Sequence, residues 1–285
     1  MTKVLVFGAS GMLGNAMLRF LVASEGLRVW GTVRSASTGS KLPAEVRERL
    51  ITGVDVERSD HLVEAMRQAR PEVVVNCIGL VKQLEAADDP LEAIPINSLL
   101  PHRLARLADA AGARLVHVST DCVFDGAKGN YRESDVPDAK DLYGRSKLLG
   151  EVDYPNAVTL RTSIIGHELE GARSLIGWFL AQEGEVEGFS KAVFSGLPTV
   201  ELARVVRDFV IPNRDLRGLY HVSAEPIDKL ALLRLVAEAY GKSIAIRPSE
   251  RVALDRSLDS SRFRSATGYQ PPAWPELIET MERFR

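Results

Sequence analysis

The chain opens on Lys3-Val4-Leu5-Val6-Phe7-Gly8-Ala9-Ser10-Gly11-Met12-Leu13-Gly14, and this stretch decides the fold. The apolar run is typical of a parallel strand buried on both faces, and apolar residues then recur at helical spacing. Strand, glycine turn and helix form the geometry that binds a dinucleotide, because the backbone can approach a pyrophosphate and the helix start offers free N–H groups. The spacing is G-x-x-G-x-x-G, which is often only a tight turn, but its place at the first strand favours a nucleotide site.

Apolar runs and helical patterns continue to alternate as far as residue 119. This alternation predicts an α/β fold with a doubly wound parallel sheet (Rossmann) and a site at the carboxyl ends of the strands. We predict an NADP-binding domain over residues 1–165 and a smaller α/β substrate domain over residues 166–285, with part of 190–223 returning to the first. Further strands are expected at 27–33, 50–56, 73–79, 114–119, 156–165 and 218–223, and a long helix at 90–111, interrupted near Pro95 and Pro101.

The end of the second predicted strand indicates which dinucleotide is bound. An acidic residue there would bind the ribose 2′-hydroxyl of NAD, whereas this chain has Thr32-Val33-Arg34-Ser35 and no carboxylate. Arg34 can pair with a 2′-phosphate, because a guanidinium group matches phosphate geometry. The stretch therefore favours NADP(H), and the alternative is that Arg34 is merely solvated.

Composition narrows the class of protein. The 285 residues carry a net charge of −2, which does not suggest a nucleic-acid partner. No apolar run is long enough for a membrane span, and the N-terminal run is too short for a signal peptide. Cys77 and Cys122 lie in apolar surroundings typical of reduced thiols, which favours a cytoplasmic protein. The histidines show no ligand spacing, so we expect no metal site, and a homodimer is left open.

Tyr143 and Lys147 lie four residues apart, which on a helix places both side chains on one face. A phenol has an unperturbed pKa of about 10, and a neighbouring ammonium group lowers that pKa by favouring the phenolate. Such a pair can move a proton to or from a substrate oxygen near neutral pH. The alternative is one turn of solvated helix. Thr120, at the end of the fifth predicted strand, is interpreted together with this pair.

Four motifs resemble those of the extended short-chain dehydrogenase/reductases. They are Gly8-x-x-Gly11-x-x-Gly14, Asn76-Cys77-Ile78-Gly79, Ser119-Thr120-Asp121 and Tyr143-x-x-x-Lys147. More narrowly, residues 119–126 and 143–151 are similar to those of the dTDP-4-dehydrorhamnose reductase family, as is Gly196-x-Pro198-Thr199. The resemblance covers nearly the whole chain. Its middle motifs are specific and its C-terminal ones are looser.

Two segments depart from that family pattern. Cys77-Ile78-Gly79-Leu80-Val81-Lys82-Gln83 looks more like reductases that act on UDP-linked 2-acetamido-6-deoxy-4-keto sugars, whereas the rhamnose enzyme has small residues there. Because this segment is expected at the substrate, the sugar and its nucleotide stay open. Cys122 stands where the rhamnose enzyme commonly has Tyr, and we expect that change to affect packing.

The resemblance implies that NADPH reduces the 4-keto group of a nucleotide-activated 6-deoxysugar, a nucleotide-sugar substrate. Tyr143 would donate the proton, Lys147 would lower its pKa and hold the nicotinamide ribose, and Thr120 would bind the substrate oxygen. Asp121 would orient Thr120 or contact the ribose. The implied cofactor-binding residues are Gly8, Ser10, Gly11, Met12, Leu13 and Gly14 in the glycine turn, Arg34 and Ser35 at the 2′-phosphate, Asp55 and Val56 along the adenine, Cys77, Ile78 and Gly79 beside the ribose and nicotinamide, and Ser119, Tyr143 and Lys147.

Other functions fit the sequence less well. An epimerase of this fold normally has an acidic residue after the second strand, and a dehydratase has an acidic pair where this chain has Asp121-Cys122. A non-catalytic, cofactor-binding regulatory subunit stays open, because the beta subunit of methionine adenosyltransferase resembles the same reductases. Candidates for contacts to a substrate diphosphate are Arg161, His167, Lys191, Arg247 and Arg262, with solvated surface charges as the alternative.

Overall fold

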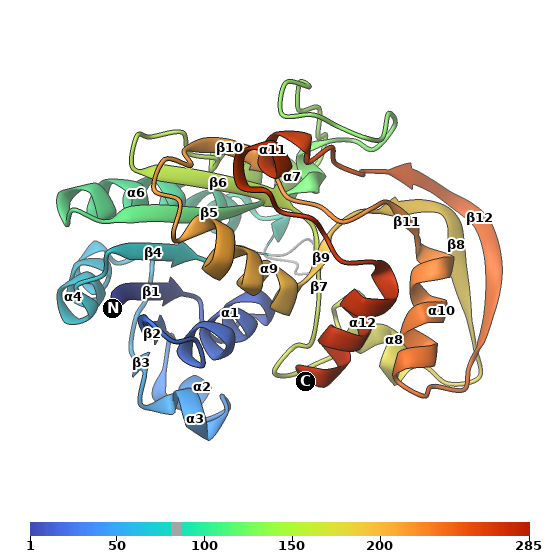
Figure 1. Cartoon of the computed structure of the whole chain (residues 1–285), viewed down its shortest axis with the longest axis horizontal. Coiled ribbons are helices and arrows are strands. Elements are labelled where there is room, and N and C mark those ends of the chain that lie inside the picture. Colours follow the sequence, from blue (N-terminus) through green and yellow to red (C-terminus); the bar gives the residue numbers. More distant parts are fainter. Residues whose placement is uncertain (81–86) are drawn as a thin grey trace.

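The computed structural model describes residues 1–80 and 87–285. Its centre is a sheet of seven parallel strands in the order β10-β6-β5-β4-β1-β2-β3 (Figure 1). The order reverses between β1 and β4, which confirms the predicted doubly wound sheet and places a ligand crevice at this point. The strands are β1 (Thr2–Phe7), β2 (Leu27–Thr32), β3 (Leu50–Ile51), β4 (Val73–Asn76), β5 (Arg114–Thr120), β6 (Ala157–Thr162) and β10 (Gly218–His221).

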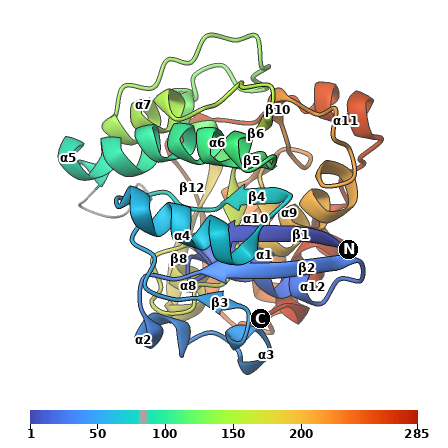
Figure 2. The same ribbon diagram turned by 90° about the vertical axis from the view of Figure 1, so that its left-hand side faces the viewer.

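Helices cover both faces of this sheet (Figure 2). On one face, Val4 and Val6 pack in a core with α1 (Met12–Val22) and α9 (Thr199–Val205). On the other face, Leu5 and Phe7 pack with α4 (Ser59–Ala69) and α6 (Leu100–Ala110). Because successive side chains of a strand point to opposite faces, burial on both sides explains the nearly continuous apolar runs in the sequence.

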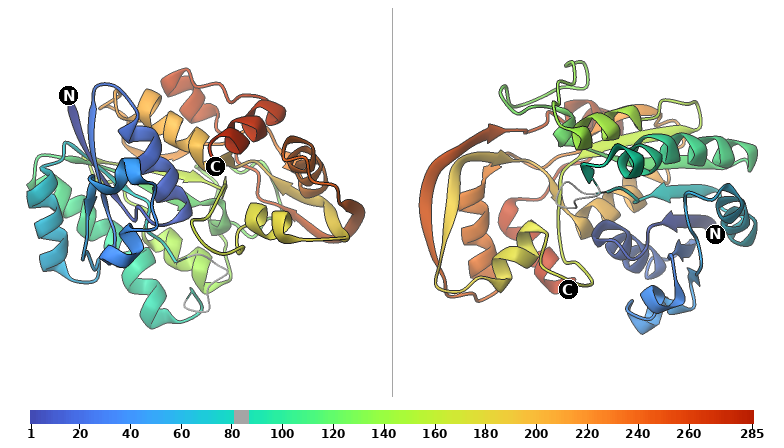
Figure 3. Two further views of the ribbon diagram at one scale, coloured as in Figure 1. Left: turned by 90° about the horizontal axis from the view of Figure 1, so that it is seen from below. Right: turned by 180° about the vertical axis from the view of Figure 1, so that it is seen from behind.

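The chain builds a smaller unit beyond β6 (Figure 3). Its three-stranded sheet has the order β11-β8-β12, with β8 antiparallel to β11 and parallel to β12. The chain then returns to the large sheet, because β10 pairs with β6. The exact domain boundary stays a prediction. The elements of this part are β7 (Ile164–Ile165), α8 (Leu175–Ala181), β8 (Glu185–Phe194), β9 (Leu197–Pro198), η4 (Val206–Val210), β11 (Ile227–Asp228), α10 (Lys229–Ala239), β12 (Ala245–Asp255), α11 (Ser261–Thr267) and α12 (Trp274–Arg283).

Several predicted elements differ in the structure, among them the fourth strand, which ends at Asn76 and not at Gly79. The third strand covers only Leu50–Ile51 instead of residues 50–56, and Gly53 then turns the chain with a φ of +77°. The helical region 90–111 is continuous past both prolines as α5 (Pro90–Ala93), the π-helical turn η2 (Ile94–Leu99) and α6. Each proline stands at the start of its segment, where a missing backbone N–H is tolerated.

The remaining elements connect the strands of the large sheet. They are α2 (Ala36–Gly39), α3 (Ala44–Arg47), the short 3-10 turn η3 (Asp121–Val123) and α7 (Leu142–Leu149). In the part of the chain that the structure describes, no helix combines the length and apolar character that a bilayer crossing requires. The same residues contain no group of three His, Cys, Asp or Glu side chains placed to hold a metal ion.

Candidate active site

The glycine turn lets the start of α1 pack closely against the carboxyl end of β1. Gly8 has a φ of +85°, which glycine adopts without strain, and a Cβ on Gly14 would collide with the Gly8 carbonyl. Gly11 precedes α1 and has no side chain that could cap the helix. The first N–H groups of α1 are therefore available to an anion such as a phosphate. Leu13 is buried in the core, so only its backbone is available at the turn.

The residues predicted at the adenosine end follow two neighbouring segments at one edge of the sheet. The N–H of Val54 donates to the carbonyl of Val33 (3.1 Å), so the backbones of these segments are paired just before the two predicted pairs of residues. These pairs are Arg34-Ser35 and Asp55-Val56, with Arg34 exposed and the Ser35 hydroxyl capping α2. The arrangement leaves the Arg34 guanidinium group accessible to a phosphate beside β2.

Thr120 and Tyr143 meet at the carboxyl end of β5. Tyr143 lies in the first turn of α7, which Asp141 caps by accepting a backbone N–H group (2.7 Å). The hydroxyl group of Thr120 lies close enough to that of Tyr143 to lower the pKa of the phenol, although burial has the larger effect. Thr120 also donates to Asp121 (3.1 Å) and accepts the N–H of Cys122 (3.1 Å). Burial raises the pKa of Tyr143 above its ordinary value, so this phenol stays protonated at neutral pH.

Lys147 follows Tyr143 by one turn and is buried, with 5% of its surface exposed. Its ammonium group donates to the carbonyl of Val118 (3.0 Å), and burial lowers its pKa to about 8. It also lies beside Gly79, since a Cβ on Gly79 would stand 3.6 Å from Nζ. Burial is the largest influence on the pKa of Tyr143 and raises it, so a lowering of that pKa by Lys147 stays a prediction.

The segment after β4 lies between the glycine turn and α7, the helix that carries Tyr143 and Lys147. The Ile78 side chain packs over Gly8 so closely that a Cβ on Gly8 would collide with it. Asn76 accepts the N–H of Ile78 (3.0 Å) and so fixes this turn of the backbone. Burial raises the pKa of Cys77 to about 12, which keeps this thiol neutral. Residues 81–83, which belong to the segment that departs from the rhamnose enzyme, lie outside the described residues.

Asn97 connects this segment to α7 by hydrogen bonds. The sequence analysis did not identify Asn97 as a site residue. Its side-chain oxygen accepts the N–H of Leu80 (2.9 Å), and its amide group donates to the hydroxyl of Ser146 (3.1 Å). Ser146 in turn donates to the carbonyl of Tyr143 (3.0 Å). Asn97 is fully buried in the π-helical turn η2, a feature that is frequent at functional sites. A polar residue within this otherwise apolar stretch was the available signal.

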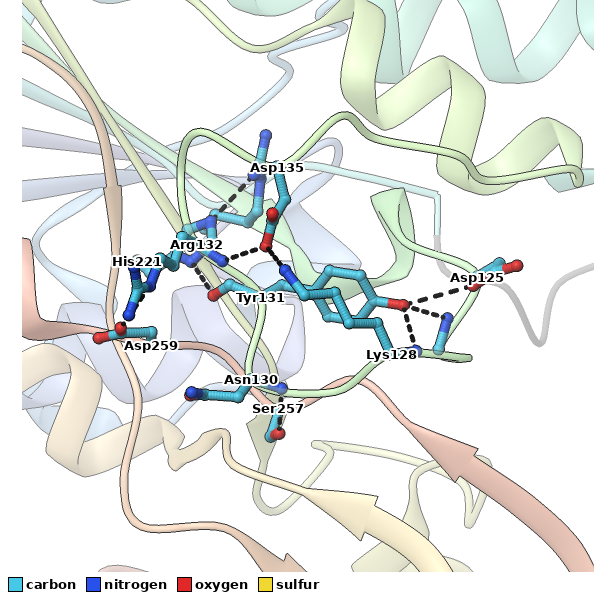
Figure 4. A network of polar contacts seen from close by, with 11 residues as sticks. Asp125, Lys128, Asn130, Tyr131, Arg132, Asp135, His221, Ser257 and Asp259 are labelled. Carbon is cyan, nitrogen blue, oxygen red and sulfur yellow. Dashed lines mark hydrogen bonds and ion pairs between the residues drawn. The ribbon is translucent and has the colours of Figure 1, made fainter.

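A polar network fastens the loop of residues 125–138, which leads into α7, to later parts of the chain (Figure 4). The Tyr131 hydroxyl accepts two backbone N–H groups of this loop (3.1 Å each), and its carbonyl accepts the Nδ1–H of His221 (3.0 Å). Arg132 forms an ion pair with Asp259 (3.2 Å). The loop that separates Thr120 from Tyr143 in the sequence is therefore held by the residues around β10 and β12.

Arg161 was predicted to contact a diphosphate, and the structure corrects this prediction. Only 1% of Arg161 is exposed, and its guanidinium group donates twice to the carboxylate of Glu151 (2.9 and 2.6 Å). It also donates to Nε2 of His221 (2.9 Å). The hydroxyl of Ser119, a predicted cofactor residue, donates to the same Glu151 (2.7 Å). These side chains stabilise the interior behind the site.

The other four candidates for a diphosphate also contact groups within the protein. His167 bonds to Tyr240 (2.8 Å), Lys191 pairs with Glu250 (2.6 Å), Arg247 pairs with Glu185, and Arg262 lies 4.7 Å from the ring centre of Tyr220. None of these four side chains is buried as Arg161 is. A contact to the substrate diphosphate therefore stays a prediction for each of them.

Comparison with known proteins places the chain among nucleotide-sugar reductases and their relatives. Methionine adenosyltransferase 2 subunit beta of Rattus norvegicus is 30% identical over 97% of this chain and 89% of its own length. A dTDP-4-dehydrorhamnose reductase of Aggregatibacter actinomycetemcomitans is 23% identical over 100% of this chain and 99% of its own. The crystal structure of dTDP-4-dehydrorhamnose reductase from Bacillus anthracis, in complex with NADP, has the same fold, with a TM-score of 0.81 over 99% of both chains and 19% identity.

A family profile described as RmlD substrate binding domain matches residues 1–282. The match covers both units of the fold and agrees with the motifs around Thr120 and Tyr143. The chain therefore belongs to the RmlD family, a group within the extended short-chain dehydrogenase/reductases.

Proposed function

We propose that the protein is an NADPH-dependent reductase of the 4-keto group of a nucleotide-activated 6-deoxysugar. The observation that carries this proposal is the meeting of Thr120 and Tyr143 at the end of β5, with Lys147 buried one turn away. Two relatives support it, since one is named dTDP-4-dehydrorhamnose reductase and the fold neighbour from Bacillus anthracis binds NADP.

The glycine turn fits a dinucleotide cofactor. Gly14 lets the start of α1 pack against the Gly8 carbonyl, and the uncapped N–H groups of α1 suit a pyrophosphate. The exposed Arg34 suits the 2′-phosphate that distinguishes NADP from NAD. NADPH would supply the hydride, and the residues at the end of β5 would act on the substrate oxygen.

Tyr143 is the proposed proton donor. Negative charge grows on the carbonyl oxygen as hydride reaches the carbonyl carbon, and this oxygen then takes the phenolic proton. The raised pKa of Tyr143 ensures that the proton is present at neutral pH. Thr120 would donate to the same oxygen and stabilise its charge, while the ammonium group of Lys147 would offset the charge left on the phenolate.

The kinetic test is the substitution Tyr143→Phe. Oxidation of NADPH would be followed by its near-ultraviolet absorbance with a panel of dTDP- and UDP-linked 4-keto-6-deoxysugars. We expect turnover to fall about 10²- to 10⁴-fold, the usual effect of a lost general acid, while NADPH affinity persists. Tyr220→Phe is the matched control, because Tyr220 lies in β10 at the far edge of the sheet, and it should keep normal turnover. Near-normal turnover of Tyr143→Phe would remove Tyr143 from the mechanism.

A second candidate function is a non-catalytic, dinucleotide-binding subunit. It is favoured by the similarity to methionine adenosyltransferase 2 subunit beta, which extends over 97% of this chain. The same panel separates the two functions. A reductase consumes NADPH with at least one sugar, whereas a binding subunit would show affinity for NADPH without turnover of any of them.

A further inference from the structure

The segment that follows β12 contacts the loop that follows Thr120. The N–H of Asp255 donates to the carbonyl of Gly126 (2.8 Å), and the Ser257 hydroxyl accepts a backbone N–H group of the same loop (2.8 Å; Figure 4). A Cβ on Gly126 would lie only 3.0 Å from Cγ of Arg256, so the two segments are closely packed. The C-terminal unit therefore reaches the loop that begins at the proposed catalytic threonine.

Arg256, the first residue after β12, contacts the turn of residues 121–125. Its Nε donates to the carbonyl of Phe124 (2.8 Å). One terminal nitrogen lies 3.5 Å from the carbonyl oxygen of Asp125, and the other lies 3.7 Å from Sγ of Cys122. A guanidinium group presents its N–H groups in a rigid, planar fork, so several contacts to one short turn restrict the shape of that turn.

The first residues of the same turn hold the hydroxyl group of Thr120. Its oxygen accepts the N–H of Cys122 (3.1 Å), and its hydrogen is donated to Asp121 (3.1 Å). A hydroxyl group has one hydrogen, so a substrate oxygen can receive it only if the hydroxyl rotates away from Asp121. The N–H of Cys122 keeps the oxygen in place while the hydrogen changes its partner. The backbone of the turn therefore sets the position of the Thr120 hydroxyl.

The charge of Arg256 also acts on Asp121, which is buried. Burial raises the pKa of this carboxyl group, and the neighbouring guanidinium group opposes that rise. A carboxylate whose charge is offset by a cation accepts a hydrogen bond less strongly. Arg256 therefore makes it easier for Thr120 to release its hydrogen from Asp121 to a substrate oxygen.

We propose that Arg256 is a positioning residue that fixes the turn of residues 121–125 and thereby orients the hydroxyl group of Thr120 toward the substrate oxygen. The inference rests on the proposed reductase function and gives the C-terminal unit a part in the chemical step. If Arg256 acts through Thr120, its loss slows the reaction only while residue 120 carries a hydroxyl group. A purely structural role of Arg256 would slow the reaction in either case.

The test is a double-mutant cycle of Arg256→Met and Thr120→Val, with a sugar nucleotide that the wild-type protein reduces. Arg256→Met removes the N–H donors, and Thr120→Val replaces the hydroxyl group by a methyl group. We expect Arg256→Met to lower kcat about 10- to 100-fold, the size of loss that misplacement of a catalytic group causes, and to leave KM for NADPH unchanged. Thr120→Val should lower kcat about 10²- to 10³-fold, as for one lost donor to an oxyanion.

The double variant carries the decision. Arg256→Met should cause no further loss of kcat when residue 120 is already valine. Losses that multiply would overturn the inference, because independent effects add in free energy. Arg251→Met is the matched control and should keep normal turnover, since Arg251 lies on β12 and pairs with Glu187 at the surface (2.7 Å). Should Arg256→Met fail to fold, Arg256→Lys takes its place, because an ammonium group cannot form the guanidinium fork.

Failure of the wild-type protein to oxidise NADPH with any sugar would instead reject the proposed function. Amide hydrogen exchange, followed by NMR, then tests the positioning of Thr120 separately. We expect Arg256→Met to speed exchange of the Cys122 N–H, which donates to Thr120, by about 10-fold or more. The N–H of Tyr131, which donates to the carbonyl of Ser257 (2.8 Å), should keep its rate. An unchanged rate at Cys122, or equal acceleration of both amides, would overturn the inference.

Discussion

The two halves of the candidate site are built in different ways. The centre of the cofactor half is one continuous stretch, residues 8–14, in which the backbone of α1 approaches the carbonyl of Gly8 so closely that Gly14 must lack a side chain. The substrate half is assembled from side chains that are distant in the sequence, including Tyr131, Arg161 and His221. The first half depends on small residues and the second on paired polar groups, so substitutions should damage the two halves by different mechanisms.

The polar groups of the substrate half form one connected network. Ser119 and Arg161 both donate to Glu151, Arg161 donates to Nε2 of His221, and His221 donates to the carbonyl of Tyr131. The network therefore runs from β5 through β6 and β10 to the loop that precedes α7. Glu151 and Arg161 each contact two other members, so loss of either side chain removes a partner from more than one buried group.

Arg161→Met should give the largest loss of stability. The substitution leaves the carboxylate of Glu151 buried without its cation, and breaking a buried pair typically costs about 3–5 kcal/mol. We expect the free energy of unfolding, measured by urea denaturation, to fall by this amount.

The double variant Arg161→Met with Glu151→Gln is the matched control. Replacing the carboxylate by a neutral amide removes the unpaired charge, so part of the lost free energy of unfolding should return. A single-variant loss below about 1 kcal/mol, the size found for exposed ion pairs, would contradict the importance of this network.

The sequence predicted the parallel sheet and the strand–turn–helix arrangement at the glycines, but not how the polar groups of the substrate half are paired. Short sequence patterns indicate the glycine turn, the parallel sheet and the strand before Thr120. These patterns can be recognised without knowing which distant residues pack against them. The role of Arg161 was missed, although a charged residue in a strand that is otherwise apolar must usually be paired inside. Asn97 was missed because its partners Leu80 and Ser146 come from other elements, and no spacing in the sequence connects them.

The substrate half should also make stability depend on pH through His221. This imidazole is fully buried, and burial together with the Arg161 charge lowers its pKa from 6.5 to about 4. The unfolded chain therefore binds more protons than the folded one between these two values, so stability falls as the pH drops from about 6.5 to about 4. A shift of this size corresponds to about 3 kcal/mol across that window, measurable by urea denaturation at a series of pH values.

His221→Asn separates this effect from other titrations. An amide can still donate to the carbonyl of Tyr131 but takes up no proton in this range. We expect the variant to be less stable at neutral pH and to show a flatter dependence below pH 6.5. His117, a second buried histidine with a lowered pKa, remains in the variant, so the change in slope reports His221 alone. An unchanged slope would show that other groups cause the acid sensitivity.

The cofactor half should respond more weakly, and through packing. Gly14→Ala adds a Cβ that collides with the Gly8 carbonyl, and overpacking of this kind typically costs about 1–3 kcal/mol. Because α1 must move away from the turn, NADPH affinity should fall as well, which a fluorescence titration measures. Gly11→Ala is the matched control for stability, since its Cβ would lie 3.5 Å from the same carbonyl, an ordinary contact. If both variants unfold at the same urea concentration as wild type, α1 shifts without cost, and the cofactor half does not depend on close backbone packing.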